Sequence, residues 1–164
     1  MNRVAAGQWP EITLERVKEA LLSSLGDDLQ EAEAVGICGS LARGTGFSEQ
    51  SDIDVFVVVR EVEAAGTTDK RWWQRIQQAL EPFGRDVTVL VYSLAGLKQV
   101  SNWYVLRLAA EGLLIYDQAE VARLFGQIVQ AARQAGLAQE MIDDRLVWTV
   151  SPDRAGAPIE VTLT

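Results

Sequence analysis

The stretch GSLARGTGFSEQSDIDVFVVV, residues 39–59, decides the fold and the chemistry of this chain. It places a Gly-Ser turn, an arginine and an Asp-x-Asp pair in a fixed order before a run of β-branched residues. Because such residues are typical of strands, residues 52–59 are predicted to form a buried strand. A polar, glycine-rich loop that leads into a strand with two carboxylates is suited to holding phosphate and a metal ion.

The Asp-x-Asp pair and a third aspartate are candidate metal ligands. Successive side chains of a strand point to opposite faces, so Asp52 and Asp54 project from the same face. Two neighbouring carboxylates repel each other unless a cation or hydrogen-bond donors compensate them. Asp86 opens the adjacent predicted strand, residues 86–92. We therefore predict that Asp52, Asp54 and Asp86 are catalytic and hold a pair of Mg²⁺ ions, with Mn²⁺ as the alternative metal.

The turn before the pair supplies candidate phosphate ligands. Gly39 and Ser40 lie where a strand ends and a helix begins, so backbone N–H groups and the helix dipole can receive a phosphate there. Gly39 lets a triphosphate approach the backbone, and Ser40 adds a hydroxyl donor. Arg43 can contact phosphate oxygens through its forked guanidinium. With Ser51, which directly precedes the pair, these residues are predicted to bind a nucleotide.

Several of these assignments have a structural alternative. Arg43 is equally well explained as the ion-pair partner of a motif carboxylate. Ser51 fits a turn or capping role better than a ligand role. Asp86 can cap its strand or pair with Arg85 or Arg60.

Composition narrows the chemistry further. The chain has no histidine, and Cys38 is its only cysteine, so an intramolecular disulfide, a Cys-based zinc site and histidine-based catalysis are excluded. Carboxylates and hard metals such as magnesium remain. A net charge of −8 opposes binding to long nucleic acids and anionic membranes. No apolar run is long enough to span a bilayer and no signal peptide is evident, so we expect a cytoplasmic protein.

The rest of the chain predicts an α/β (α+β) fold, a small mixed β-sheet with helices packed against it. Helices are expected from about residue 11 to 25 and over residues 68–80, 101–111 and 120–134, and strands over 35–38, 52–59 and 86–92. Trp72, Trp73 and Trp103 are expected in the core. The segments LVWTV and IEVTL flank SPDRAGAP and predict a C-terminal β-hairpin. Residues 1–144 would form the main domain and residues 145–164 a hairpin extension of it.

The pattern GSLARG-x6-SDIDVFVVV resembles the signature of the polymerase-β-type nucleotidyltransferase superfamily, and most closely its minimal nucleotidyltransferases. The strand that starts at Asp86 and the stretch AAEGLLIYD, residues 109–117, fit that family too, so the resemblance covers roughly residues 12–117. The loop between Ser40 and Asp52 is one residue longer than is common in minimal members. This difference falls in a loop and leaves the metal pair undisturbed.

The resemblance implies a polymerase-β-like fold and a magnesium-dependent transfer of a nucleoside monophosphate, AMP from ATP, to a hydroxyl group. Asp52 and Asp54 would then bind both metals, and Asp86 would share the metal that positions the acceptor or take the acceptor's proton. Minimal nucleotidyltransferases often act as antitoxins that adenylylate a tyrosine of a HEPN-type ribonuclease. A HEPN-type toxin is therefore the expected protein partner.

Two other functions remain open at this stage. Transfer to a small molecule, as in aminoglycoside nucleotidyltransferases, suits the acidic charge equally well. A hairpin that helps to build a substrate cleft would favour this function, whereas a flat apolar hairpin face would favour a protein partner or a homodimer. The second alternative is a non-catalytic module that binds a nucleotide or a partner without transfer. Polymer synthesis is not expected, because the chain lacks a basic track for nucleic acid.

Overall fold

A four-stranded mixed sheet forms the centre of the molecule. The structure is a computed structural model and describes residues 11–163. The expectation that the first ten residues are not part of a signal peptide lies outside the described residues. The strands are β1 (Ala34–Cys38), β2 (Ile53–Val59), β3 (Val87–Ser93) and β4 (Leu113–Asp117). They lie in the order β3-β2-β1-β4, with β1 antiparallel to both β2 and β4 and β2 parallel to β3. The predicted fold class, a mixed sheet with helices, is confirmed.

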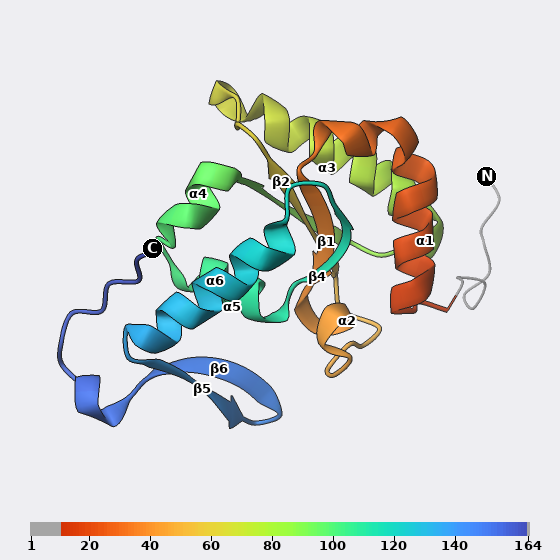
Figure 1. Cartoon of the computed structure of the whole chain (residues 1–164). Helices are drawn as coiled ribbons and strands as arrows, with labels where there is room; N and C mark the ends of the chain where they lie inside the picture. The colour runs from red at the N-terminus through yellow and green to blue at the C-terminus, as the bar shows by residue number, and fades with distance from the viewer. Residues whose placement is uncertain (1–10, 164) are drawn as a thin grey trace.

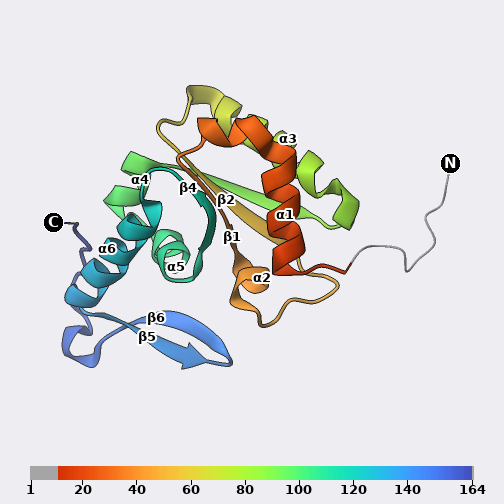
Figure 2. The same cartoon turned by 45° about the vertical axis from the view of Figure 1, so that its right-hand side comes forward.

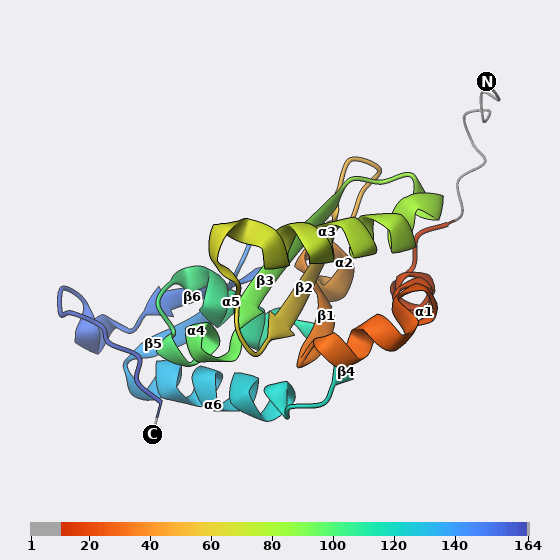
Figure 3. The ribbon, with the colours of Figure 1, turned by 90° about the horizontal axis from the view of Figure 1, so that it is seen from above.

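Helices cover both faces of this sheet (Figure 1). Seen from above, α1 (Leu14–Leu25) and α3 (Thr67–Leu80) lie on one side of the strands, and α5 (Trp103–Glu111) and α6 (Val121–Gln134) lie on the other (Figure 3). Two short helices, α2 (Gly39–Arg43) and α4 (Leu94–Gln99), follow β1 and β3 directly. The helices predicted from about residue 11 to 25, over 68–80 and over 120–134 are therefore confirmed. The segment expected to be helical over 101–111 is α5, and α4 is an element that the sequence did not predict.

Sequence and packing agree closely in α1 and β2. The hydroxyl of Thr13 caps α1 by accepting a hydrogen bond from Arg16 N at 3.2 Å. Strand β2 alternates as expected: Ile53, Val55 and Val57 face a core shared with α1 and α3, whereas Phe56 and Val58 face a second core shared with α5 and α6. The sheet therefore separates two apolar layers.

The C-terminal hairpin differs from the prediction. Strand β5 (Leu137–Ile142) pairs with β6 (Arg145–Val150), and Asp143 and Asp144 form the turn with φ of 49° and 62°. The segment IEVTL, residues 159–163, forms no strand; its apolar residues pack against the α5–α6 layer instead. The expected hairpin of LVWTV with IEVTL was therefore wrong, because the strand LVWTV pairs with the chain before it. Figure 2 shows the hairpin beside α5 and α6, away from the main sheet.

The tryptophans also depart from expectation in part. Trp72 is fully buried, as predicted, but Trp73 is 47% exposed and Trp103 is 55% exposed. Trp148 on β6 is buried, and its Nε1 donates to the carbonyl oxygen of Leu106 at 3.2 Å, which fastens the hairpin to α5. Among the residues the structure describes, no helix is long and apolar enough to cross a membrane.

Candidate active site

The Asp-x-Asp pair lies at the end of the sheet where β1 finishes and β2 and β3 begin. In the strand ladder, Asp54 is flanked by Cys38 of β1 and Thr88 of β3. Asp54 is half-buried, whereas Asp52, which precedes the strand, is exposed. Because residues two apart share a face, both carboxylates project to the side of the sheet that carries α5.

The carboxyl group of Asp54 is held in an environment that disfavours its charge. Burial raises its pKa, and the negative charge of Asp52 raises it further. A hydrogen bond from the side chain of Thr88 and the positive charge of Arg43 act in the opposite direction and lower it. A cation bound next to Asp54 would therefore stabilise the ionised form of this carboxylate.

Gly39 is essential to the close packing around Asp54. It has φ of 70°, in the left-handed region that favours glycine. A Cβ atom at this position would overlap Oδ2 of Asp54. The first residue of the Gly-Ser turn therefore brings the backbone directly against the carboxylate, and Ser40 follows it in the first turn of α2.

Asp86 does not complete a preformed metal cluster. It is exposed, and its carbonyl oxygen accepts a hydrogen bond from Ile53 N at 2.9 Å, which places it next to Asp52 at the start of the parallel ladder. Within residues 11–163, no three acidic or cysteine side chains lie close enough together to hold a metal ion. The donor set nevertheless fits magnesium, because Mg²⁺ commonly uses one or two carboxylates and completes its shell with water and substrate phosphates.

Arg43 pairs with a carboxylate outside the motif. Its Nη1 lies 3.6 Å from Oε2 of Glu111, the last residue of α5, and the two side chains are only 17% and 10% exposed. The Nε of Arg43 is buried and has no hydrogen-bond partner among the described residues. A guanidinium with an unused donor, held at the edge of the site, is suited to an anionic ligand.

Ser51 belongs to the loop that leads to the aspartates. Its Oγ accepts a hydrogen bond from Ser48 N at 2.9 Å, as in a turn. Arg85 secures the same loop from the start of β3, since its Nη1 donates to the carbonyl oxygens of Ser48 and Ser51 at 2.8 and 2.7 Å. The guanidinium also lies 5.2 Å from the ring centre of Phe47. Arg85, which the sequence suggested as a partner for Asp86, therefore holds the loop in front of Asp52.

A cavity of about 470 Å³ opens beside Asp54, between β3 and α5. Its floor is formed by Thr88, Leu90 and Tyr92, which alternate along β3. The lining further includes Cys38, Gly39, Arg43, Asp54, Asn102, Tyr104, Arg107, Leu108 and Glu111. The cavity thus joins two predicted phosphate ligands and one predicted metal ligand; Ser40, Ser51, Asp52 and Asp86 do not line it.

Sequence reasoning did not assign the polar residues that α5 and β3 bring to the cavity. Arg107 and Glu111 are one helical turn apart, so they share a face of α5. Their spacing was a usable signal for a common face, but only the position of α5 across the cavity from β3 makes that face a wall of the site. Thr88 lies two residues after Asp86, so alternation places both on one face of β3, and the contact of Thr88 with Asp54 follows from the parallel register.

A family comparison agrees with this geometry. The family model described as "Nucleotidyltransferase domain" matches residues 14–109, which include the Gly-Ser turn, all three aspartates and most of α5. No curated protein matches the chain significantly.

Two of the solved structures that match this chain come from toxin–antitoxin complexes. One is a chain of a toxin–antitoxin crystal structure with AMP-PNP, which is 21% identical to this chain. The match covers 72% of this chain and 93% of the other, with a TM-score of 0.50. The other is a chain from the complex of tri-AMPylated Shewanella oneidensis HEPN toxin with MNT antitoxin, which is 19% identical. That match covers 74% of this chain and 92% of the other, with a TM-score of 0.44. At 21% identity, the likeness to the structure with AMP-PNP concerns the fold alone.

Proposed function

This chain belongs to the nucleotidyltransferase domain family, and we propose that it transfers a nucleoside monophosphate, AMP from ATP, to a hydroxyl group in a Mg²⁺-dependent reaction. The observation that carries the proposal is the half-buried Asp54, which lies beside Gly39 and Arg43 at a cavity large enough for a ligand. The raised pKa of Asp54 and the unused donor of Arg43 support a site that takes a cation and a phosphate together.

In this proposal the protein positions the reactants and neutralises charge. Asp52 and Asp54 hold the divalent metal, which when bound stabilises negative charge on the phosphate oxygens. Gly39 and Ser40 face the triphosphate, with Arg43 beside them. Asp86, next to Asp52, is the candidate for a further metal ligand or for accepting the acceptor's proton.

The bond changes follow from an in-line displacement. The acceptor hydroxyl oxygen attacks the α-phosphorus, the bond from this phosphorus to the bridging oxygen breaks, and pyrophosphate leaves. The hydroxyl proton passes to a carboxylate or to water. The products are the nucleotidylated acceptor, pyrophosphate and a proton.

A protein acceptor is the leading candidate, in the manner of the MNT antitoxin found with an AMPylated HEPN toxin. The net charge of −8 suits a basic partner. Met141 and Ile142 at the tip of the hairpin are 67% and 47% exposed, which gives this end of the molecule an apolar surface for a protein partner or a second copy.

A small-molecule acceptor is the second candidate. The hairpin contributes Leu146, Val147 and Trp148 to a cavity of about 190 Å³ against α5, and a cleft built partly by the hairpin favours a small acceptor. The third candidate is a non-catalytic module that binds a nucleotide or a partner without transfer.

A labelling experiment separates the three. Lysate of the source cell would be incubated with Mg²⁺, α-labelled ATP and either the wild type or Asp52→Asn. We expect label on a protein that is lost with the variant. Asp52-dependent label on a small molecule would support the aminoglycoside-type function. No Asp52-dependent label, with the other nucleotides also tested, would reduce the chain to a binding module.

A further inference from the structure

We propose that Arg107 of α5 is a second polyphosphate-binding arginine of this site and contacts the β- and γ-phosphates of the bound nucleotide. This inference rests on the proposed nucleotidyl transfer and adds a residue that lies outside the Gly-Ser and Asp-x-Asp signature.

Four charged side chains surround the end of β1. The thiol of Cys38 has its pKa raised to about 12, mainly by burial, and the charges of Asp54 and Glu111 raise it further. The charges of Arg107 and Arg43 lower it. All four side chains also line the 470 Å³ cavity, so they form one charged cluster.

The two arginines of this cluster differ in their partners. Arg43 is bound to Glu111 at 3.6 Å. Arg107 forms no ion pair and no side-chain hydrogen bond within residues 11–163, although it lines the same cavity. An unpaired guanidinium on the wall of a cavity that Asp54 also lines is a free cation for an anionic ligand.

The ligand of this site needs such a cation. A nucleoside triphosphate carries a charge of about −4 at neutral pH, and the pyrophosphate that leaves keeps most of it; catalysis of such transfers depends on cations that surround the phosphates. Arg43 lies next to the Gly-Ser turn, and Arg107 faces the site from α5 across the cavity. The two guanidinium groups therefore approach the phosphates from different elements.

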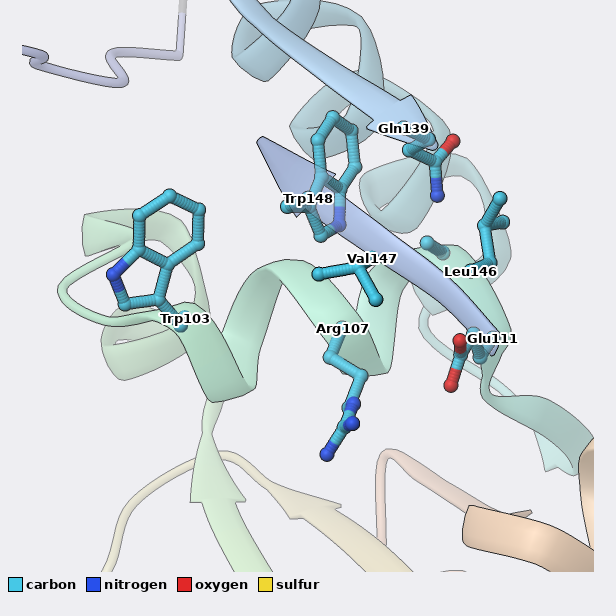
Figure 4. A pocket seen from close by; sticks show the side chains of 8 residues that line it. Trp103, Arg107, Glu111, Gln139, Leu146, Val147 and Trp148 are labelled. Carbon is cyan, nitrogen blue, oxygen red and sulfur yellow. The ribbon is translucent and has the colours of Figure 1, made fainter. Parts of the chain in front are cut away.

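The hairpin packs against the part of α5 that carries Arg107. Figure 4 shows Trp103, Arg107 and Glu111 in succession along α5, with Val147 and Trp148 of β6 beside the helix. These five residues line the small cavity between α5 and the hairpin, and the Trp148 indole is hydrogen-bonded to the residue before Arg107. The hairpin, which lies beyond the matched family region, thus fixes the part of α5 that carries Arg107.

The test is direct binding of AMP-PNP with Mg²⁺ by calorimetry, with AMP as the comparison ligand. Arg107→Gln is expected to weaken AMP-PNP binding about tenfold or more and to leave AMP binding within about twofold, because AMP lacks the outer phosphates. Arg107→Lys should recover part of the loss, since it restores the charge without the fork. Arg123→Gln, an equal charge change at an exposed position of α6, is the control and should bind AMP-PNP as the wild type does.

Each other outcome overturns the proposal. If Arg107→Gln binds AMP-PNP like the wild type, Arg107 is no phosphate ligand, while the proposed transfer stands. If AMP and AMP-PNP are weakened equally, Arg107 acts on the nucleoside or on the fold, and the melting temperatures of the Gln and Lys variants show which. If the wild type itself binds no AMP-PNP, both this inference and the proposed function fail.

Discussion

The two faces of the central sheet are packed to different degrees, although the same strands build both. On the face covered by α1 and α3, the side chains of β2 meet Trp72, Ile76 and Leu80 in a fully buried core. On the opposite face, α5 and α6 cover β1 and most of β2, while the cavity lies over the β3 side. Closed packing on one face holds the strands in register, so the open face can keep a half-buried carboxylate that lowers stability.

The largest effect is expected from the carboxylate on the open face. Asp54→Asn should reduce nucleotidyl transfer by about a thousandfold or more, because the amide binds a divalent cation poorly. Asp69→Asn at an exposed position of α3 is the matched control and should transfer normally. Transfer rates of the two variants, measured side by side, check this. An active Asp54→Asn would show that the open face is not the catalytic one.

On the closed face we expect a large loss of stability instead. Trp72→Ala should lower the free energy of unfolding by about 3–5 kcal/mol, because it empties a fully buried site. Tyr92→Ala, on the half-buried floor of the cavity, should cost only about 1 kcal/mol. Urea unfolding of both variants measures the difference. Equal losses would mean that the cavity floor is as tightly packed as the core, and the comparison of the faces would fail.

The close approach of Gly39 to Asp54 predicts an effect of intermediate size. Gly39→Ala forces a Cβ atom against the carboxylate and strains a left-handed backbone by about 1–2 kcal/mol, so transfer should fall about 100-fold. Gly126→Ala in α6 is the control, because a Cβ there meets open space and should add up to about 1 kcal/mol of stability. The contrary result is a Gly39→Ala enzyme with unchanged transfer and unchanged Mg²⁺ dependence.

A smaller change is expected in the pH dependence. The hydrogen bond from Thr88 lowers the pKa of Asp54, so Thr88→Val should raise that pKa. Because the metal binds the ionised carboxylate, the acid limb of kcat/KM should move to higher pH, with little change at alkaline pH. A profile that is unmoved, or moved to lower pH, would rule out this role of Thr88.

The same carboxyl group gives the smallest effect, on stability without metal. The folded protein raises the pKa of Asp54 above its ordinary value. The protonated carboxyl therefore stabilises the fold below the ordinary pKa of aspartic acid, and this stabilisation is lost as the pH rises through the raised pKa. At neutral pH, with a chelator present to remove divalent metal, Asp54→Asn should therefore melt at a slightly higher temperature than the wild type. A lower Tm at neutral pH would show that the ionised carboxylate stabilises the fold.

The end of the sheet that carries the Asp-x-Asp pair was largely predictable, because its residues are close together in the sequence. Asp52 and Asp54 share a face by simple alternation, and Gly39 begins the turn before them. The three-aspartate metal site is a different matter: Asp86 lies beside Asp52 but forms no preformed cluster with the pair. Its role as a ligand stays a prediction.

The remainder depends on packing between distant segments, which local patterns do not specify. Arg107 and Glu111 reach the site only because α5 lies across the cavity from β3. The hairpin was misplaced because LAQEMI, residues 137–142, lacks the β-branched alternation of a strand, and Asp143 and Asp144 at its turn resemble an ordinary solvated pair. The buried Trp148 shows the same limit, since its partner lies on α5, 42 positions earlier.

The most direct test of the account compares ATP labelled at the α-phosphate with ATP labelled at the γ-phosphate, each incubated with the wild-type protein, Mg²⁺ and lysate of the source cell. Nucleotidyl transfer predicts that the acceptor gains only the α-label and that the γ-label appears in pyrophosphate. An acceptor that gains the γ-label, or no acceptor label from either nucleotide, would contradict it.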